Sequence, residues 1–342
     1  MMSIKLCDMS GHLIARCIPK GQCPIMTRYY VCIGHRRRQH PSVRHTPLLI
    51  TIALLACCLV ATLLAGCSTT FTSAEELSGR LLVTGSTALQ PLVTSAAKLF
   101  MKHHSGVTIT VLGGGSKTGL NDVTSGKMYK IDGTNRLYKV DIGDSDIYAD
   151  PAIYPDPNLT DHIVCVVPFT MIVNPDVHIP SLTKEQIVGI FSTGQYHNWN
   201  ELGGPDLPIT PVVRPSTSGT RDTFRKYILD GRDEKGQLLD KDSSTLVRDT
   251  VAQTPGAIGY VSLSWLNNSV RAIDINGSTP TKGNIAAGNY SFWSYEHMYT
   301  MGDNNPLVSS FLDFMLTPEV QNMAQAMHYI PIANMNPATT SS

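Results

Sequence analysis

Two hydrophobic periods alternate along the chain between residues 79 and 335. Short apolar runs predict strands, and several of these runs alternate apolar and polar residues with a period of two. The predicted strands cover residues 79–86, 107–111, 140–147, 163–173, 209–213 and 256–261. Apolar residues at helical spacing predict helices after several of these strands, over residues 89–100, 116–123 and 183–191, from Ser218 onward, and over 305–327. This alternation predicts an α/β protein with parallel sheets covered by helices on both faces.

The length and the charge of the chain limit the kinds of protein that it can form. A chain of 342 residues exceeds one average core, so we expect two lobes with a ligand cleft between them once a targeting segment is removed. Lys plus Arg and Asp plus Glu both number 27, without long runs of like charge outside the N-terminus. An extended nucleic-acid footprint therefore has no electrostatic basis, and any recognition of an anion must be local.

The N-terminal region reads as a targeting segment. Basic residues up to Arg44 precede an apolar run over residues 47–66, as in a signal peptide. The run ends in small residues before Cys67, which resembles the lipobox of bacterial lipoproteins, where the peptide is cleaved before the cysteine and the thiol carries lipid. We expect residues 1–66 to be an N-terminal extension with a signal peptide, Cys67 to be lipidated, and residues 67–78 to be a tether. A permanent membrane span is the alternative, because about twenty apolar residues can cross a bilayer.

The cysteines and histidines give no sign of a disulfide framework or a metal site. Seven of the eight cysteines lie at or before Cys67, and Cys165 sits in an apolar run, which predicts a buried core residue rather than a reactive thiol. The histidines are dispersed apart from His103 and His104, so we expect no metal and no cofactor. Residues 1–30 fit neither a signal nor a domain, and Met26 is an alternative start.

Three turns between a strand and a helix carry small hydroxyl residues: residues 85–87, 113–116 and 216–220. Each turn exposes backbone N–H groups at a helix N-terminus, where an anion is favoured, although each taken alone reads as a helix cap. Arg214 adds a planar charged donor, and Arg221 either adds another or pairs with a carboxylate across the cleft. Together these features predict a site for a small oxyanion.

Asp146 follows a predicted strand, at the edge of the sheet where a ligand binds. A carboxylate among anion-binding donors is explained if the ligand carries a proton. Phosphate near neutral pH keeps a P–OH group that can donate a hydrogen bond to a carboxylate, whereas sulfate has no proton to donate. The alternative is that Asp146 caps a helix or pairs with Arg214, and we expect the nearby Asp144 to raise the pKa of Asp146 by like-charge repulsion.

Six segments in order resemble successive motifs of the phosphate-binding proteins of ABC-type phosphate importers. They are residues 85–91, 113–116, 141–146, 198–204, 214–221 and 256–260, and they cover nearly all of residues 80–335. The resemblance implies a two-lobed, type II periplasmic-binding-protein fold that closes like a hinge, with residues 163–173 and 258–263 crossing between the lobes. The lobes and tail would then occupy residues 79–167 with 262–338, 168–261, and 339–342.

The same resemblance implies a set of phosphate-binding residues: Thr87, Ala88, Ser116, Asp146, Arg214, Ser218, Gly219 and Thr220. Ser86, Asp144 and Arg221 would lie around them. It further implies a monomeric lipoprotein outside the cell membrane that delivers phosphate to a permease and its ATPase, without catalysis. Two departures stand out: Ser216 replaces an aspartate that pairs with the arginine in some family members, and residues 128–139 are an insertion.

Other functions stay open for this sequence. A protein of the same fold could sense phosphate, act as a surface adhesin, or bind sulfate or molybdate. A serine acyl enzyme is a remote alternative, since residues 95–98 match S-x-x-K and residues 117–119 match K-T-G. These two motifs lie too close together, without S-D-N between them, and Ser95 falls inside a predicted helix.

Overall fold

The computed structural model describes residues 76–236, 238–302 and 305–335, all within the unit Thr72–Ser342. The predicted signal peptide, Cys67 with its predicted lipid and the C-terminal tail lie outside the described residues. Over the described ranges, no helix is both long enough and apolar enough to cross a membrane.

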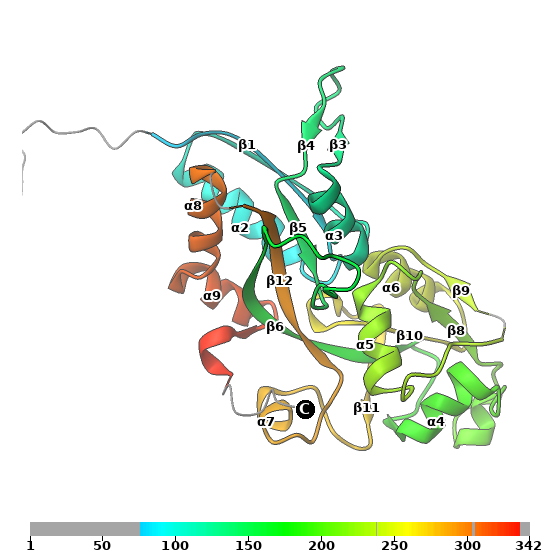
Figure 1. Cartoon of the computed structure of the whole chain (residues 1–342). Helices are drawn as coiled ribbons and strands as arrows, with labels where there is room; N and C mark the ends of the chain where they lie inside the picture. The colour runs from blue at the N-terminus through cyan, green and yellow to red at the C-terminus, as the bar shows by residue number, and fades with distance from the viewer. Residues whose placement is uncertain (1–75, 237, 303–304, 336–342) are drawn as a thin grey trace, which may run out of the picture. The chain divides into compact units, whose positions relative to one another are not determined.

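A mixed sheet runs through both lobes (Figure 1). In the first lobe, β1 pairs in parallel with β2 and with β5, and β12 pairs antiparallel with β5. These strands span Ser78–Gly85 (β1), Gly106–Leu112 (β2), Ile142–Ser145 (β5) and Trp293–Met301 (β12). The expectation of purely parallel sheets is therefore wrong, because β12 is antiparallel to both of its neighbours.

The second lobe is built on the far end of the same sheet. There β10 pairs antiparallel with β6 and in parallel with β8, β9 extends the sheet beyond β8, and β11 joins β6 to β7. These strands span Ser181–Leu182 (β7), Thr210–Val213 (β8), Leu239–Asp240 (β9), Ala257–Ser262 (β10) and Arg271–Ile275 (β11).

The long strand β6, Leu159–Val173, links the two lobes. It pairs with β12 up to Pro168 and with β13 (Ile330–Pro331) at Cys165 and Val166, and from Phe169 to Val173 it pairs with β10. Its last ten residues are all buried, which explains their continuous apolar sequence.

Helices cover the strands of each lobe (Figure 1). In the first lobe, α2 packs on β2 and α8, and α3 packs on β1 and β5, whereas α6 packs on β10 in the second. The helices are α2 (Gln90–His103), α3 (Ser116–Ser125), α4 (Lys184–Val188), α5 (Gly219–Tyr227), α6 (Ser244–Gln253), α7 (Lys282–Ala286), α8 (Pro306–Met315) and α9 (Pro318–Ala326). The predicted helix at residues 183–191 is α4 followed by a π-helical turn, Gly189–Thr193.

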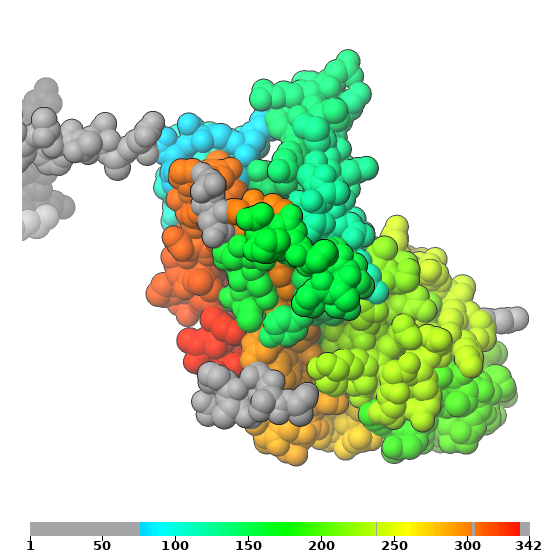
Figure 2. Space-filling view, viewed as in Figure 1, coloured from blue at the N-terminus to red at the C-terminus, as the bar shows by residue number. Residues whose placement is uncertain are grey.

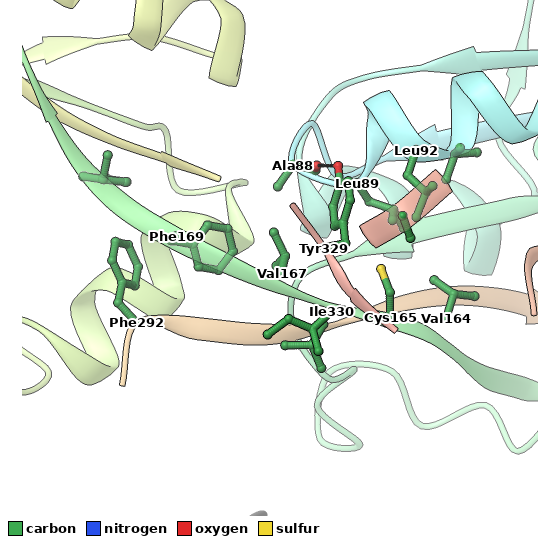
Figure 3. Packing of buried hydrophobic residues seen from close by; sticks show 14 of the residues in the cluster. Ala88, Leu89, Leu92, Val164, Cys165, Val167, Phe169, Phe292, Tyr329 and Ile330 are labelled. Atoms are coloured by element: carbon green, nitrogen blue, oxygen red, sulfur yellow. Dashed lines mark hydrogen bonds between the residues drawn. The ribbon is translucent and has the colours of Figure 1, made fainter. Parts of the chain in front are cut away.

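The core beneath the site joins β6 to the first predicted anion-binding turn (Figure 3). Val164, Cys165 and Val167 are buried there, which confirms that Cys165 is a core residue. The Tyr329 hydroxyl donates a hydrogen bond to the carbonyl of Ala88, so the residue that precedes β13 fixes the turn before α2.

The insertion at residues 128–139 forms a two-stranded hairpin that projects from the first lobe (Figures 1 and 2). Its strands are β3, Met128–Tyr129, and β4, Tyr138–Lys139, paired antiparallel. The Tyr138 hydroxyl donates to Asp132 at 2.6 Å, which holds the tip of the hairpin to its second strand.

Candidate functional site

The N-termini of α2, α3, α5 and α6 converge where the two lobes meet, as the hydrogen bonds below show. The turn before α2 needs a glycine because Gly85 has a φ of +132° and a Cβ there would lie 2.1 Å from the carbonyl oxygen of Asp144. This close approach brings the end of β1 next to the end of β5. Backbone N–H groups at such helix starts favour an anion.

Asp146 lies at the centre of this convergence, only 2% exposed. One carboxylate oxygen accepts a hydrogen bond from the Ser86 hydroxyl, and the other accepts from the Thr220 hydroxyl at 2.6 Å. Its backbone N–H donates to the Ser116 hydroxyl at 2.9 Å. Because Thr220 belongs to the second lobe, the Asp146 carboxylate links the two lobes.

Arg214 extends from the end of β8 and is 1% exposed. Its guanidinium donates to the Thr87 hydroxyl and the Asp242 carbonyl, both at 3.2 Å, and to the Ser244 hydroxyl at 3.3 Å. Over the described residues, Arg214 forms no ion pair and its Nε has no hydrogen-bond partner. The alternative that Asp146 is simply the salt-bridge partner of Arg214 is therefore wrong.

The electrostatics of Arg214 favour an anionic ligand. Burial lowers the pKa of its guanidinium, while the charge of Asp146 acts in the opposite direction. A buried charge without a close partner carries a large desolvation cost. An anion that reaches the free Nε would supply the missing partner.

Ser244, at the start of α6, is a site residue that the sequence analysis missed. It is fully buried, its hydroxyl lies 3.0 Å from that of Thr87, and its N–H donates to Thr87 at 3.3 Å. The available signal was the pair Ser243 and Ser244 just before the apolar helical pattern of Val247 and Val251, which marks a helix start.

The remaining predicted residues lie at the same place but in different roles. The Ala88 N–H donates to the Ser86 hydroxyl at 3.0 Å, and Ser218 caps α5 by accepting from the Arg221 N–H at 3.2 Å. Gly219 approaches the first lobe so closely that a Cβ there would lie 2.3 Å from the Ser116 hydroxyl oxygen. The structure thus brings together all eight predicted residues, Thr87, Ala88, Ser116, Asp146, Arg214, Ser218, Gly219 and Thr220.

Lys117 connects the two lobes through hydrogen bonds and an ion pair at the edge of the site. Its N–H donates to the Thr217 carbonyl at 3.0 Å, and its ammonium contacts the Ser216 carbonyl at 2.9 Å and Asp222 at 2.7 Å. The lobes are therefore in direct contact in this structure.

One alternative was that Arg221 pairs with a carboxylate across the cleft, and this is wrong. Arg221 pairs with Glu234, which belongs to the same lobe and accepts a hydrogen bond from the Tyr260 hydroxyl at 2.7 Å. Burial raises the pKa of Glu234, and burial together with Glu234 raises the pKa of Tyr260 well above its usual value. Arg221 and Tyr260 therefore support the loop and strand behind Arg214.

Asp144 is buried next to Asp146, with one carboxylate oxygen that has no hydrogen-bond partner over the described ranges. Burial first, and the charge of Asp146 second, raise the pKa of Asp144 well above its usual value. The like-charge effect thus raises the pKa of Asp144, whereas we had expected it for Asp146.

The chemistry of the site suits recognition of an anion. Hydroxyls, helix N-termini and Arg214 supply donors, and the Asp146 carboxylate supplies only acceptors. Within the described part of the chain, no cluster of three or more His, Cys, Asp or Glu side chains could hold a metal. Ser95, the candidate nucleophile of the enzyme alternative, lies within α2 and donates to the Pro91 carbonyl at 2.9 Å.

The two-lobed fold with a buried site between the lobes defines the class of bilobal binding proteins, and comparisons with known proteins agree. A family model described as a PBP superfamily domain matches residues 72–319. The phosphate-binding protein PstS of Bacillus subtilis is 41% identical over 264 residues, which are 76% of this chain and 83% of that protein. The chain belongs to the PBP superfamily and, within it, to the family of PstS.

Solved structures agree with this assignment. A putative phosphate ABC transporter substrate-binding protein from Clostridium perfringens, solved with bound phosphate, has a TM-score of 0.66 and 25% identity, over 74% of this chain and all of that one. An ABC-type phosphate transport receptor from Vibrio cholerae has a TM-score of 0.57 and 24% identity, over 73% and 99%, and shows the likeness of the fold.

Proposed function

We propose that this protein binds inorganic phosphate between its two lobes and delivers it to an ABC-type phosphate permease and its ATPase. The observation that carries the proposal is the buried Asp146 carboxylate, an acceptor among donors. Phosphate can donate its P–OH to this carboxylate while its other oxygens accept hydrogen bonds. Fully deprotonated sulfate would place an oxygen lone pair against a negative charge.

The other site residues supply the donors in this proposal. Arg214 contributes its charge and its free Nε, the hydroxyls of Thr87 and Ser116 can turn toward a ligand oxygen, and the Thr220 hydroxyl holds Asp146 in place. The N-termini of α2, α3 and α5 add backbone donors and a favourable dipole, with Ala88 just before α2, Ser218 capping α5 and Gly219 in the first turn of α5. The names of the Bacillus and Clostridium relatives support phosphate as the ligand.

The protein, in this proposal, lies outside the cell membrane and is anchored to it by a lipid on Cys67. The apolar run before Cys67 and the small residues next to it support this, as does the PstS family. Labelling of cells with a palmitate analogue should mark the wild-type protein. The Cys67→Ser variant should be unlabelled, and labelling of that variant would exclude Cys67 as the lipid site.

Isothermal titration calorimetry of the purified protein with phosphate, sulfate and molybdate tests the ligand. We expect saturable binding of phosphate and little or no binding of the other two anions. Binding of sulfate or molybdate without binding of phosphate would contradict the role of Asp146. A transport role further predicts that deleting the gene lowers phosphate uptake, whereas a role in sensing or adhesion would leave uptake unchanged.

A further inference from the structure

A further buried acid, Glu296, lies behind the site. It belongs to β12 and is 0% exposed. Over the described residues, neither of its carboxyl oxygens has a hydrogen-bond partner, and it forms no ion pair. An ionised carboxylate in such surroundings would carry the full desolvation cost, so this side chain needs a physical explanation.

The strand register brings Glu296 close to Asp146. In the antiparallel pair of β5 and β12, His297 lies opposite Ser145, and Met298 lies opposite Asp144. Glu296 and Asp146 are the next residues along, just past the last pair of β5, and the charge of Asp146 acts on Glu296. Like charges that meet across neighbouring strands are destabilising.

The titratable groups around Glu296 are all acids. Asp144 of β5 and Asp146, just after that strand, act on Glu296, Cys165 lies opposite it on β6, and Tyr329 is a neighbour from the segment before β13. His297, the next residue, belongs to the other face of β12, where its ring nitrogen contacts Asp161 at 2.9 Å. Burial first, and then the charges of Asp146 and Asp144, raise the pKa of Glu296 well above its usual value.

Asp146, unlike Glu296, has the hydrogen-bond donors that favour an ionised carboxylate. Its carboxylate accepts hydrogen bonds from the hydroxyls of Ser86 and Thr220, which stabilise the ionised form, whereas Glu296 has no donor. A protonated Glu296 is itself a donor, and the nearby charge of Asp146 raises the pKa of Glu296 further, after burial. The proton therefore belongs on Glu296.

We propose that Glu296 is a positioning and specificity-determining residue of the anion site, a neutral acid that donates a hydrogen bond to Asp146 from behind. This proposal rests on the proposed phosphate function. The hydrogen bond holds Asp146 turned toward the ligand, so that Asp146 accepts a hydrogen bond from the P–OH group of phosphate. Without a proton on Glu296, the two neighbouring carboxylates would compete for one proton, and Asp146 would be a poorer acceptor for the ligand.

Two substitutions separate this role from simple packing. Glu296→Gln keeps a neutral donor, whereas Glu296→Met fills a similar volume without one. By calorimetry near pH 7, we expect Glu296→Gln to bind phosphate within a few-fold of the wild type, and Glu296→Met to bind about tenfold more weakly or worse. The control Glu319→Gln changes an exposed acid at the start of α9 and should bind as the wild type does. Equal phosphate affinity of the Met variant and the wild type would overturn the proposal.

Infrared spectroscopy tests the proton directly and does not depend on phosphate. We expect the carbonyl band of protonated carboxylic acids in the wild type near neutral pH to lose intensity in Glu296→Gln but not in Glu319→Gln. If the variants do not fold, the wild-type spectrum still decides, because the absence of any protonated-acid band would overturn the proposal. A wild type that binds no phosphate would instead refute the proposed function, while the infrared result still tests Glu296.

Discussion

Replacing Arg214 with methionine should separate ligand affinity from protein stability. Methionine keeps a long apolar stem in a position that is 1% exposed and removes the guanidinium. The three protein acceptors of that guanidinium are neutral, and two of them, the Thr87 and Ser244 hydroxyls, also hydrogen-bond to each other at 3.0 Å. The substitution therefore leaves few unsatisfied groups behind.

The expected loss of affinity follows from the kind of interaction that is removed. A hydrogen bond to a charged group contributes about 1.5–3 kcal/mol. That range corresponds to a phosphate Kd that is roughly 10-fold to 150-fold higher. Without phosphate, the free energy of unfolding should be unchanged or higher, because the wild type buries a cation that has no carboxylate partner.

Calorimetry gives the Kd, and chemical denaturation with and without phosphate gives the two stabilities. The control is Arg225→Met, which removes an arginine of α5 that pairs with Asp233 outside the site. The control should keep the phosphate affinity of the wild type. Wild-type affinity in Arg214→Met would refute the assignment of Arg214 to the ligand.

Three further predictions test other parts of the site. Asp146→Asn should reduce the preference for phosphate over sulfate in competition calorimetry, because an amide can donate as well as accept, and an unchanged preference would remove Asp146 from ligand contact. Gly219→Ala should raise the phosphate Kd about tenfold or more, because the alanine Cβ would lie 2.3 Å from the Ser116 hydroxyl oxygen and hinder closure of the lobes. The matched control is Gly283→Ala, where the new Cβ meets only one atom, at 4.0 Å, and the affinity should equal that of the wild type. The raised pKa of Glu296 predicts a pH effect on stability: its contribution is full below its unfolded pKa of about 4.3 and is lost progressively as the pH rises toward the raised pKa of the folded protein. Glu296→Gln lacks this loss, so the unfolding free energy of this variant minus that of the wild type should increase as the pH rises above about 4.3. If this difference does not change with pH, the folded-state pKa of Glu296 is not raised.

Local patterns in the sequence predicted the helix starts of the site well. The glycine and hydroxyl residues before α2, α3 and α5 predict turns and helix caps, which depend only on residues that are neighbours in the sequence. Thr317 followed by Pro318 is a local signal of the same kind, and the Thr317 hydroxyl caps α9 by accepting a hydrogen bond from the Val320 N–H.

The parts that the sequence did not predict depend on contacts between distant segments. Strand β12 places Glu296 and His297 in a fully buried part of the sheet, so its polar residues gave no apolar run to recognise. The partnership of Arg221 with Glu234 joins a helix to a loop, and no local spacing indicates it. The boundaries of the lobes and the lipid on Cys67 stay predictions.

A crystal structure of the protein with phosphate tests the central claim most directly. We predict an anion between the lobes with one oxygen about 2.5–2.7 Å from a carboxylate oxygen of Asp146, as expected for a charge-assisted O–H···O hydrogen bond. The Arg214 guanidinium should contact another oxygen of the same anion. Phosphate bound elsewhere, or bound between the lobes without contact to Asp146, would contradict the account.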